Sequence, residues 1–343
     1  MATNIILALL TLSLLVFVHE VGHFLMAVAT GARVEIFSIG FGRALWKRKF
    51  FGTEYRLSLI PLGGYVAILN DGSEMSLNRK PVWKRALVAF AGPLANFVLA
   101  VIIFSTLFSI GGQIPTNIVQ AVTSGSPAER GGLIAGDKIV GTSGKKIESQ
   151  NELAALLADS PGAPLRLDIE KDGGKVFSTT VIPDAVKIVD QTGEEKIVGR
   201  IGITFRMSGE KMGLFESLYY GTEKTLNNCR LIIHMLFKMF SNQVSSESIA
   251  GPIFILMAAG DQADAGLVPL FAFAAMLSLN LAVFNLLPIP VLDGGELLLL
   301  FIESIKGSPV NESAMEMFHR TGLAMMALLF LYAFYSDITR LLS

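Results

Sequence analysis

Cysteine is almost absent from this chain of 343 residues. The single cysteine, Cys229, excludes an intramolecular disulfide, and it also excludes a zinc site built from several thiolates. Histidine is scarce too, with four residues, so any metal site has to combine a few imidazoles with carboxylates.

Charge is the second feature that the sequence has little of. Charged residues make up 17% of the chain and the formal net charge is -1, so no nucleic-acid partner is predicted. Hydrophobic residues, in contrast, reach 52%, which is more than an ordinary soluble domain holds. This balance predicts a polytopic α-helical protein that crosses a lipid bilayer and carries some mass outside it.

Four apolar runs are long enough to cross a membrane, for which about 20 residues are needed. The first lacks a basic leader and a small-residue cleavage site, so we interpret it as a retained transmembrane helix. Two further apolar patches, at 231–240 and 249–259, are too short to span. The predicted spans lie at about residues 4–29, 86–110, 268–288 and 321–340.

Basic residues gather between the first two spans. Residues 30–85 contain ten Lys and Arg but four Asp and Glu. Loops rich in Lys and Arg stay in the cytoplasm, so this loop is predicted to be cytoplasmic and residues 111–267 extracytoplasmic. The first and third spans then run in the same direction, which brings His19 and the end of the third span to the same, cytoplasmic, depth.

The longest segment outside the spans has the character of a soluble, β-rich domain. Short β-type runs and turn signals fill about 116–205, with a strand at 118–122 and an amphipathic helix at 150–158. Residues 165–170 and 176–182 are expected to form a hairpin through the turn at 171–174. The predicted domains are 1–110 with two spans and the cytoplasmic loop, 111–208 as a small β-rich binding domain, 209–266 as an amphipathic helical connector, and 267–343 with the last two spans.

The motif His19-Glu20-Val21-Gly22-His23 lies within the first span. Histidines four residues apart share one face of a helix, one turn apart, and this spacing suits two-point binding of zinc. In such motifs the glutamate acts as the general base. Buried polar residues at membrane depth are costly and usually serve a function, so the motif predicts half of a zinc-hydrolase site.

A hydrolytic zinc needs a third protein ligand and one open position. Asp293 is a candidate, because Pro288 and Pro290 break the helix before it, and irregular backbone is tolerated at membrane depth only where it lines a cavity. A helix N-cap at the membrane surface is the alternative role for this aspartate. His234 and His319 fit surface or interfacial roles better.

Residues 55–69 alternate in polarity and turn at Gly63-Gly64, which predicts a β-hairpin against the membrane. A peptide bond inside a helix is shielded, so its cleavage requires local unwinding into a strand. The hairpin, including Tyr65, could hold that strand by β-augmentation, and an ordinary surface hairpin is the alternative. The sequence GPLAN at 92–96 places a Gly-Pro and an amide at membrane depth, which is consistent with a helix face that points inward.

Together these segments resemble the site-2 protease family of intramembrane zinc metalloproteases, and specifically its bacterial regulator-of-sigma-E protease branch. The resemblance covers nearly the whole chain, and the pairing of HExxH with an NxxPxPxLDGG segment is highly specific. It is carried by HEVGH at 19–23, IPLGGYV at 60–66, AGPLANF at 91–97, a PDZ-like SPAERGGLIAGDKIV at 126–140, NLLPIPVLDGG at 285–295, and the tail from GSPVNESAMEMFHRTG to SDITRL.

The resemblance implies a fold of about four transmembrane helices with a re-entrant β-hairpin and an inserted PDZ-like domain. It places that hairpin at about 52–70, with Gly40 and Gly42 in a nearby loop. The site residues that it implies are His19, His23 and Asp293 for Zn²⁺, Glu20 as general base, and Asn285, Pro288 and Pro290 in the substrate cleft, beside the hairpin residues Gly63, Gly64 and Tyr65.

The implied task is cleavage of a single-pass membrane protein, such as an anti-sigma factor or a remnant signal peptide, after a first protease has trimmed it. The implied location is the bacterial cytoplasmic (inner) membrane, in a stress response, with a peptide end bound at the PDZ-like domain. Two departures stand out. The best-known members carry two PDZ domains whereas this length accommodates one, and Glu296 stands where His is frequent.

Two other functions compete with the protease. A receptor or scaffold would use the PDZ-like domain to bind peptides and would need no catalytic residues. A transporter would line an ion path with its intramembrane charges, but no inverted repeat is visible. The complete HExxH, the distant aspartate and the proline-broken helix favour the enzyme.

Overall fold

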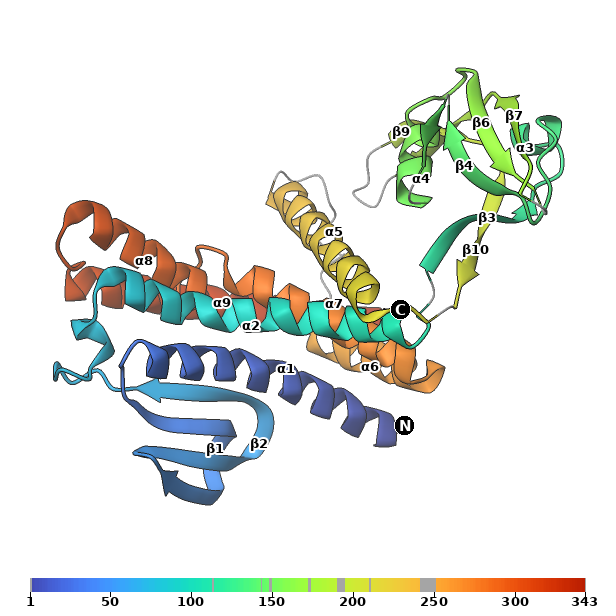
Figure 1. Cartoon of the computed structure of the whole chain (residues 1–343). Helices are drawn as coiled ribbons and strands as arrows, with labels where there is room; N and C mark the ends of the chain where they lie inside the picture. Colours follow the sequence, from blue (N-terminus) through green and yellow to red (C-terminus); the bar gives the residue numbers. More distant parts are fainter. Residues whose placement is uncertain are drawn as a thin grey trace. The chain divides into compact units, whose positions relative to one another are not determined.

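The chain folds into two compact units in this computed structural model, which describes residues 2–112, 114–142, 144–147, 150–171, 174–189, 195–209, 211–240 and 251–342. The membrane unit comprises the described residues of 1–107, 214–237 and 245–343. The β-rich unit comprises those of 108–213 and 238–244. Figure 1 shows the helical character of the first and the strands of the second.

Long helices build the membrane unit. Four of them are long and apolar enough to cross a bilayer, over Leu7–Ala29, Val82–Ser109, Leu267–Asn285 and Ser313–Thr339. The four spans predicted from the sequence are therefore confirmed, and the last is longer than expected. The helices are α1 (Ala2–Ala29), the 3₁₀ turn η1 (Leu77–Arg79), α2 (Val82–Ser109), α5 (Leu214–Phe240), α6 (Pro252–Ala265), α7 (Leu267–Asn285), α8 (Asp293–Lys306) and α9 (Glu312–Leu342).

Two long strands, β1 (Val34–Phe50) and β2 (Thr53–Ile68), pair with each other in a sheet beside α1. Phe37 of β1 pairs with both Tyr55 and Val66 of β2, so the first half of β1 lies between two parts of β2. The second half of β1 continues on the far side, where Lys47 pairs with Arg56. The sheet therefore has four strand segments in the order 44–50, 53–60, 34–39 and 64–68.

The pairing corrects one expectation from the sequence. Residues 55–69 were predicted to fold back on themselves at Gly63-Gly64, but 53–60 and 64–68 are separated by the first half of β1. The chain does bend at Gly63, whose φ of 127° suits glycine. The alternating polarity of 55–69 correctly predicted a strand, but its pairing partner is the first half of β1, which lies outside 55–69.

The C-terminal half of α1 is anchored between the sheet and α2. Ala27, Val34 and Val88 are buried together, and Phe24 and Val66 pack against them. Further along its length α1 also packs against α6 and α7. The helix that carries the HEVGH motif is thus held on several faces, as a site of fixed geometry requires.

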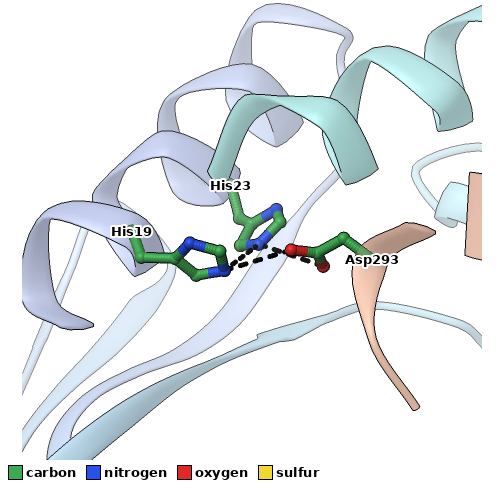
Figure 2. A group of neighbouring side chains, drawn as sticks. All are labelled: His19, His23 and Asp293. Atoms are coloured by element: carbon green, nitrogen blue, oxygen red, sulfur yellow. Dashed lines mark hydrogen bonds and ion pairs between the residues drawn. The ribbon is translucent and has the colours of Figure 1, made fainter. Parts of the chain in front are cut away.

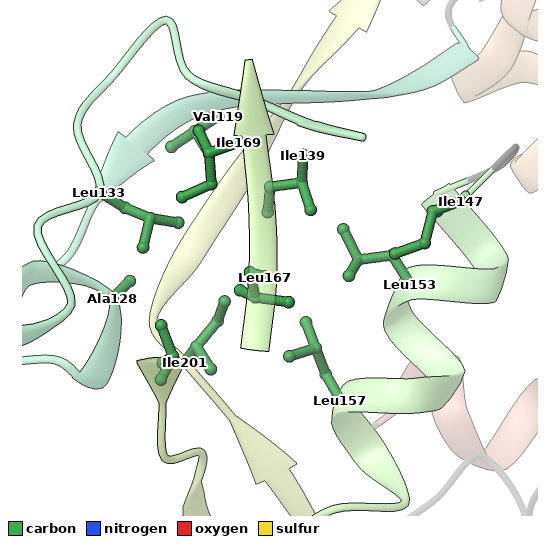
Figure 3. Close-up of a cluster of buried hydrophobic side chains, with 11 residues drawn as sticks. Val119, Ala128, Leu133, Ile139, Ile147, Leu153, Leu157, Leu167, Ile169 and Ile201 are labelled. Atoms are coloured by element: carbon green, nitrogen blue, oxygen red, sulfur yellow. The ribbon is translucent and has the colours of Figure 1, made fainter. Parts of the chain in front are cut away.

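The β-rich unit has one small core, drawn in Figure 3. Leu167 and Ile169 on β6 and Leu153 on α4 are fully buried in it. The main sheet has the order β10-β3-β4-β6-β7, with β5 paired to β4, and β8 and β9 form a separate pair. The elements are β3 (Ile114–Val122), α3 (Pro127–Arg130), β4 (Lys138–Thr142), β5 (Lys145–Lys146), α4 (Gln150–Ala158), β6 (Leu165–Glu170), β7 (Val176–Val181), β8 (Asp184–Val189), β9 (Glu195–Arg200) and β10 (Ile203–Ser208).

Several local predictions hold in this unit. The helix at 150–158 and the hairpin of β6 and β7 are present, and the predicted strand at 118–122 is the end of β3. Residues 172–173 of the predicted hairpin turn lie outside the described residues. So do residues 210 and 241–250 of the predicted connector, whose described parts form α5 and α6.

Candidate metal centre

The two histidines of the HEVGH motif lie one turn apart on α1. His19 is 8% exposed, and its Nε2 lies 3.1 Å from Nε2 of His23. This approach is what helical spacing of i and i+4 gives on one face. Both ring nitrogens point toward the same small volume, as Figure 2 shows.

Asp293 comes to this volume from the other end of the sequence. Its Oδ2 lies 3.1 Å from His19 Nε2 and its Oδ1 lies 3.4 Å from His23 Nε2. Asp293 is the first residue of α8, and Leu292 rather than Asp293 occupies the N-cap position. The aspartate therefore does not act as the helix cap considered from the sequence.

The spacing of these donor atoms fits a zinc ion. Bonds of 2.0–2.2 Å in a tetrahedral arrangement place ligand atoms about 3.3 Å apart, and the observed separations are 3.1, 3.1 and 3.4 Å. Buried Oδ2 of Asp293 has no hydrogen-bond partner among the described residues. An acceptor oxygen without a donor, facing two ring nitrogens, is well suited to a cation. His19, His23 and Asp293 are the one group of metal-binding geometry found in the described part of the chain.

The second nitrogen of His23 is fixed by the backbone. Its Nδ1 lies 2.8 Å from the carbonyl oxygen of Val88 on α2. A carbonyl can only accept, so Nδ1 carries the proton and donates it, and Nε2 keeps a lone pair for a metal. Pro93 lies inside α2 and lacks an N–H, so it donates no hydrogen bond to the carbonyl of Ala89.

Glycines bring α1 and α2 close enough for these contacts. A Cβ on Gly22 would lie 2.3 Å from the carbonyl oxygen of Ala91, and a Cβ on Gly92 would lie 2.3 Å from His23 Nε2. Small residues allow such close helix crossings in membranes. Gly22 of HEVGH and Gly92 of GPLAN are therefore both needed for the close crossing of α1 and α2.

The turn before α8 delivers Asp293. Val291 has a φ of 78°, which is strained for a β-branched residue. A Cβ on Gly294 would lie 2.2 Å from the carbonyl oxygen of Leu287, and one on Gly295 would lie 2.3 Å from that of Ile289. The two glycines of LDGG therefore let the first turn of α8 pack directly on the backbone of the preceding turn.

Asp293 is electrostatically matched to its neighbours. Burial raises the pKa of this carboxyl, but the adjacent His19 and His23 lower it by more, and the net pKa lies below its ordinary value. The group is therefore present as a carboxylate, the form that binds a metal.

Glu20 lies beside the cluster and against the sheet. Glu20 and Val66 of β2 line the same cavity beside the cluster. A Cβ on Gly64 would lie 3.3 Å from Glu20 Cγ. The segment 64–68 is an edge of the four-segment sheet, so a strand edge runs directly past the glutamate.

A cavity of about 240 Å³ adjoins the cluster. A second cavity of about 700 Å³ shares Ile68, Leu77, Arg85 and Glu296 with the first. Glu296 lies in the first turn of α8. The first cavity is lined by Glu20, His23, Val66, Ile68, Leu77, Arg85, Val88, Ala89, Asp293 and Glu296.

Other residues singled out in the sequence have different surroundings. Asn285 ends α7, and Pro288 and Pro290 lie in the turn before α8, where Pro290 packs against Gly322 of α9. None of these three lines either cavity. Arg56 Nη1 donates to the hydroxyl of Tyr65 at 3.2 Å.

Sequence reasoning missed the groups that support the cluster. The Val88 carbonyl gives no sequence signal, because every residue has one. Arg85 and Glu303 form an ion pair between α2 and α8. This pair could be recognised only once the fold was known. The amide of Asn96 was noted for its depth, but its approach to His19 was not foreseen.

A model of peptidase family M50 matches residues 7–329, which is nearly the whole chain. The chain belongs to peptidase family M50. This M50 peptidase is 34% identical over 365 residues to a protein of Agrobacterium fabrum named as a putative zinc metalloprotease, covering 97% of this chain and 95% of the relative. It is 32% identical over 442 residues to protease RseP of Yersinia pestis, covering 97% and 98%. It is 31% identical over 445 residues to the regulator of sigma-E protease RseP of Escherichia coli, with coverage of 97% and 98%.

The M50 peptidase also matches parts of solved structures. The PDZ domain of an SdrC-like protein of Listeria innocua corresponds to 26% of this chain and 93% of that domain's chain, with 23% identity and a TM-score of 0.21. The corresponding domain of Listeria monocytogenes gives 26% and 84%, with 26% identity and a TM-score of 0.20.

Family membership decides between the functions considered from the sequence. With four spanning helices, the M50 peptidase is an intramembrane zinc metalloprotease and a multi-pass protein of the inner membrane. The receptor and the transporter are set aside. Zinc is its cofactor.

Proposed function

We propose that His19, His23 and Asp293 bind the catalytic zinc and that Glu20 is the general base. One observation carries the assignment, which is the convergence of three donor atoms from α1 and α8 at separations of 3.1, 3.1 and 3.4 Å. The set of two imidazoles and one carboxylate is typical of hydrolytic zinc sites, which keep a fourth position open.

These three residues would hold a zinc ion that would act as a Lewis acid and activate water for attack at neutral pH. Glu20 lines the same cavity as His23 and Asp293, so its carboxylate lies beside the proposed position of attack. It accepts the proton of the attacking water and transfers it to the nitrogen of the leaving amine.

The substrate strand is proposed to pair with the edge of β2 at 64–68, which includes Gly64 and Tyr65. This edge borders the 240 Å³ cavity through Val66 and Ile68. Main-chain groups along an exposed edge bind an extended peptide with little demand on its side chains. The peptide bond opposite Glu20 would then be the one that is cut.

The proposed substrates are membrane proteins with a single span, of the anti-sigma-factor or remnant-signal-peptide type, trimmed first by another protease. The similarity to the regulator of sigma-E protease of Escherichia coli supports this class. The ten Lys and Arg of 30–85 support a cytoplasmic position of the β1–β2 sheet. The β-rich unit is proposed to be extracytoplasmic and to bind a peptide end or to exclude large ectodomains.

Cleavage is tested in proteoliposomes with a single-span substrate. We expect Glu20→Gln to lower kcat by at least about 10³-fold while zinc stoichiometry stays at one, because the base acts on the reaction and not on the metal. His19→Ala and Asp293→Ala should lose zinc. Glu35→Gln, which changes an exposed glutamate of β1, is the matched control. Full activity of Glu20→Gln, or zinc retention by both ligand variants, would overturn the assignment.

The strand edge is tested by disulfide cross-linking. Cys229→Ala removes the single native thiol, and Glu20→Gln keeps the substrate uncut. A cysteine replacing Tyr65 should cross-link to cysteines around the scissile bond. Trp46, exposed on the opposite edge segment of the sheet, is the control position. Cross-linking at position 46 and not at 65 would place the substrate on the wrong side for this proposal.

A further inference from the structure

Asn96 occupies a position that ordinary packing does not explain. The side chain is fully buried on α2, and its Nδ2 lies 3.4 Å from His19 Nδ1. Its Oδ1 has no hydrogen-bond partner among the described residues. A buried oxygen without a partner is destabilising, so such a group calls for a function.

The chemistry of His19 identifies what the amide can do. A neutral imidazole that binds a metal through Nε2 carries its proton on Nδ1, and that N–H needs an acceptor. An amide nitrogen is a donor, so Nδ2 facing Nδ1 suits the opposite tautomer, which has its proton on Nε2. That tautomer cannot bind a metal through Nε2.

A half-turn of the amide pairs an acceptor with the Nδ1–H of His19 and turns Nδ2 toward the position that Oδ1 held. Rotation about the Cβ–Cγ bond exchanges Oδ1 and Nδ2, which occupy nearly the same space. Oδ1 then gains a donor, and the Nδ1–H of His19 gains an acceptor. Ser278 on α7 donates to the backbone carbonyl of Asn96 at 2.8 Å, so it fixes the residue without restraining the amide.

We propose that Asn96 is a positioning residue of the zinc site. Its Oδ1 accepts a hydrogen bond from Nδ1–H of His19 and so holds the tautomer whose Nε2 faces Asp293. The Val88 carbonyl accepts a hydrogen bond from Nδ1–H of His23 in the same way. This inference rests on the proposed ligands His19, His23 and Asp293. With Asn96 as the acceptor for His19, the Nδ1–H of each ligand histidine has a hydrogen-bond partner.

The test compares an acceptor with an apolar replacement in the full-length, detergent-solubilised protein. Zinc affinity is measured by competition with a chromogenic chelator, which needs no substrate. Asn96→Leu has a similar shape and no acceptor, and its zinc dissociation constant should rise about 10–100-fold, the usual effect of losing an outer-shell partner. Asn96→Asp presents only acceptors and should remain within about fivefold of the native value. Asn96→Ala replaces the leucine variant if that protein does not fold.

Controls separate this inference from general destabilisation and from the ligand assignment. Ser278→Ala removes the bond that fixes the backbone of Asn96, and we expect a lower unfolding temperature with zinc affinity changed by less than about threefold. His19→Ala tests the ligand set itself and should abolish tight binding. If His19→Ala binds zinc normally, the ligand set is wrong. If His19→Ala loses zinc while Asn96→Leu binds zinc normally, the proposed role of Asn96 is wrong. It is also wrong if Asn96→Asp and Asn96→Leu lower the zinc affinity equally.

Discussion

Arg85 on α2 is ion-paired with Glu303 on α8, with Nη1 lying 2.8 and 3.0 Å from the two carboxylate oxygens. Both side chains are mostly buried, at 19% and 14% exposure. Glu303 follows Asp293 by ten residues, or about 15 Å along the helix axis. The pair therefore fixes the far end of the helix whose first residue enters the metal cluster.

Removal of one partner of this pair should disturb both stability and the cluster. We expect Glu303→Ala to lower the free energy of unfolding by about 1–3 kcal/mol, since a partly buried guanidinium loses its partner. Zinc affinity should fall several-fold because α8 is less well placed. Chemical unfolding and chelator competition measure the two effects. Arg79→Ala, which removes an exposed arginine bound to a loop carbonyl, should change neither by a comparable amount.

Substitution of Gly92 by alanine tests the close crossing of α1 and α2. The new Cβ would lie 2.3 Å from His23 Nε2 and 2.8 Å from His19 Cε1, so at least one ring must move. Zinc affinity should fall at least tenfold, although alanine is the better helix former. Gly221→Ala is a control, because its Cβ would clash with Ser105 Oγ at 2.2 Å, about 20 Å further along α2. Equal loss of zinc affinity in both variants would refute the local explanation.

Asp337 on α9 should stabilise α6 from outside that helix. It is 2% exposed and accepts hydrogen bonds from the N–H groups of Gly251, Ile253 and Phe254 at 2.9, 2.9 and 3.2 Å. A carboxylate at a helix N-terminus satisfies unpaired donors and the helix dipole together. Asp337→Asn should cost about 1–3 kcal/mol in unfolding free energy. Asp264→Asn, at an exposed site on α6, should cost less than about 0.5 kcal/mol.

The core of the β-rich unit should be separable from the zinc site. Leu153 is fully buried there, so Leu153→Ala should lower the stability of this unit by about 2–5 kcal/mol. Amide hydrogen exchange on β6 measures that loss. The zinc dissociation constant should stay constant, because all three proposed ligands belong to the membrane unit. Val176→Ala, at a side chain 59% exposed, provides the control.

Features with a local physical cause could be predicted from the sequence. Runs of about 20 apolar residues predict spans, and the spacing of His19 and His23 predicts a shared helix face. The helix at 150–158 follows from its amphipathic period. The position of Asp293 was open, because its role depends on where α8 begins and on the packing of Gly294 and Gly295.

Features that depend on distant partners could not be predicted in the same way. The pairing of Phe37 with both Tyr55 and Val66 places the first half of β1 inside the fold of β2, and no window of 55–69 contains that information. Asn96 contacts His19 and Arg85 contacts Glu303, which lie 77 and 218 positions away in the sequence. The sequence shows which side chains can bind or donate, but it does not show which residues they contact.

The two histidines differ in how they respond to mutation. His23 depends on the backbone carbonyl of Val88, and every amino acid at position 88 presents that same oxygen. Its tautomer is therefore shielded from point substitution at its partner. His19 faces the side chain of Asn96, which a single substitution can remove or replace. A substitution at position 96 should thus remove or replace the partner of His19, whereas the partner of His23 is a backbone oxygen that no side chain supplies.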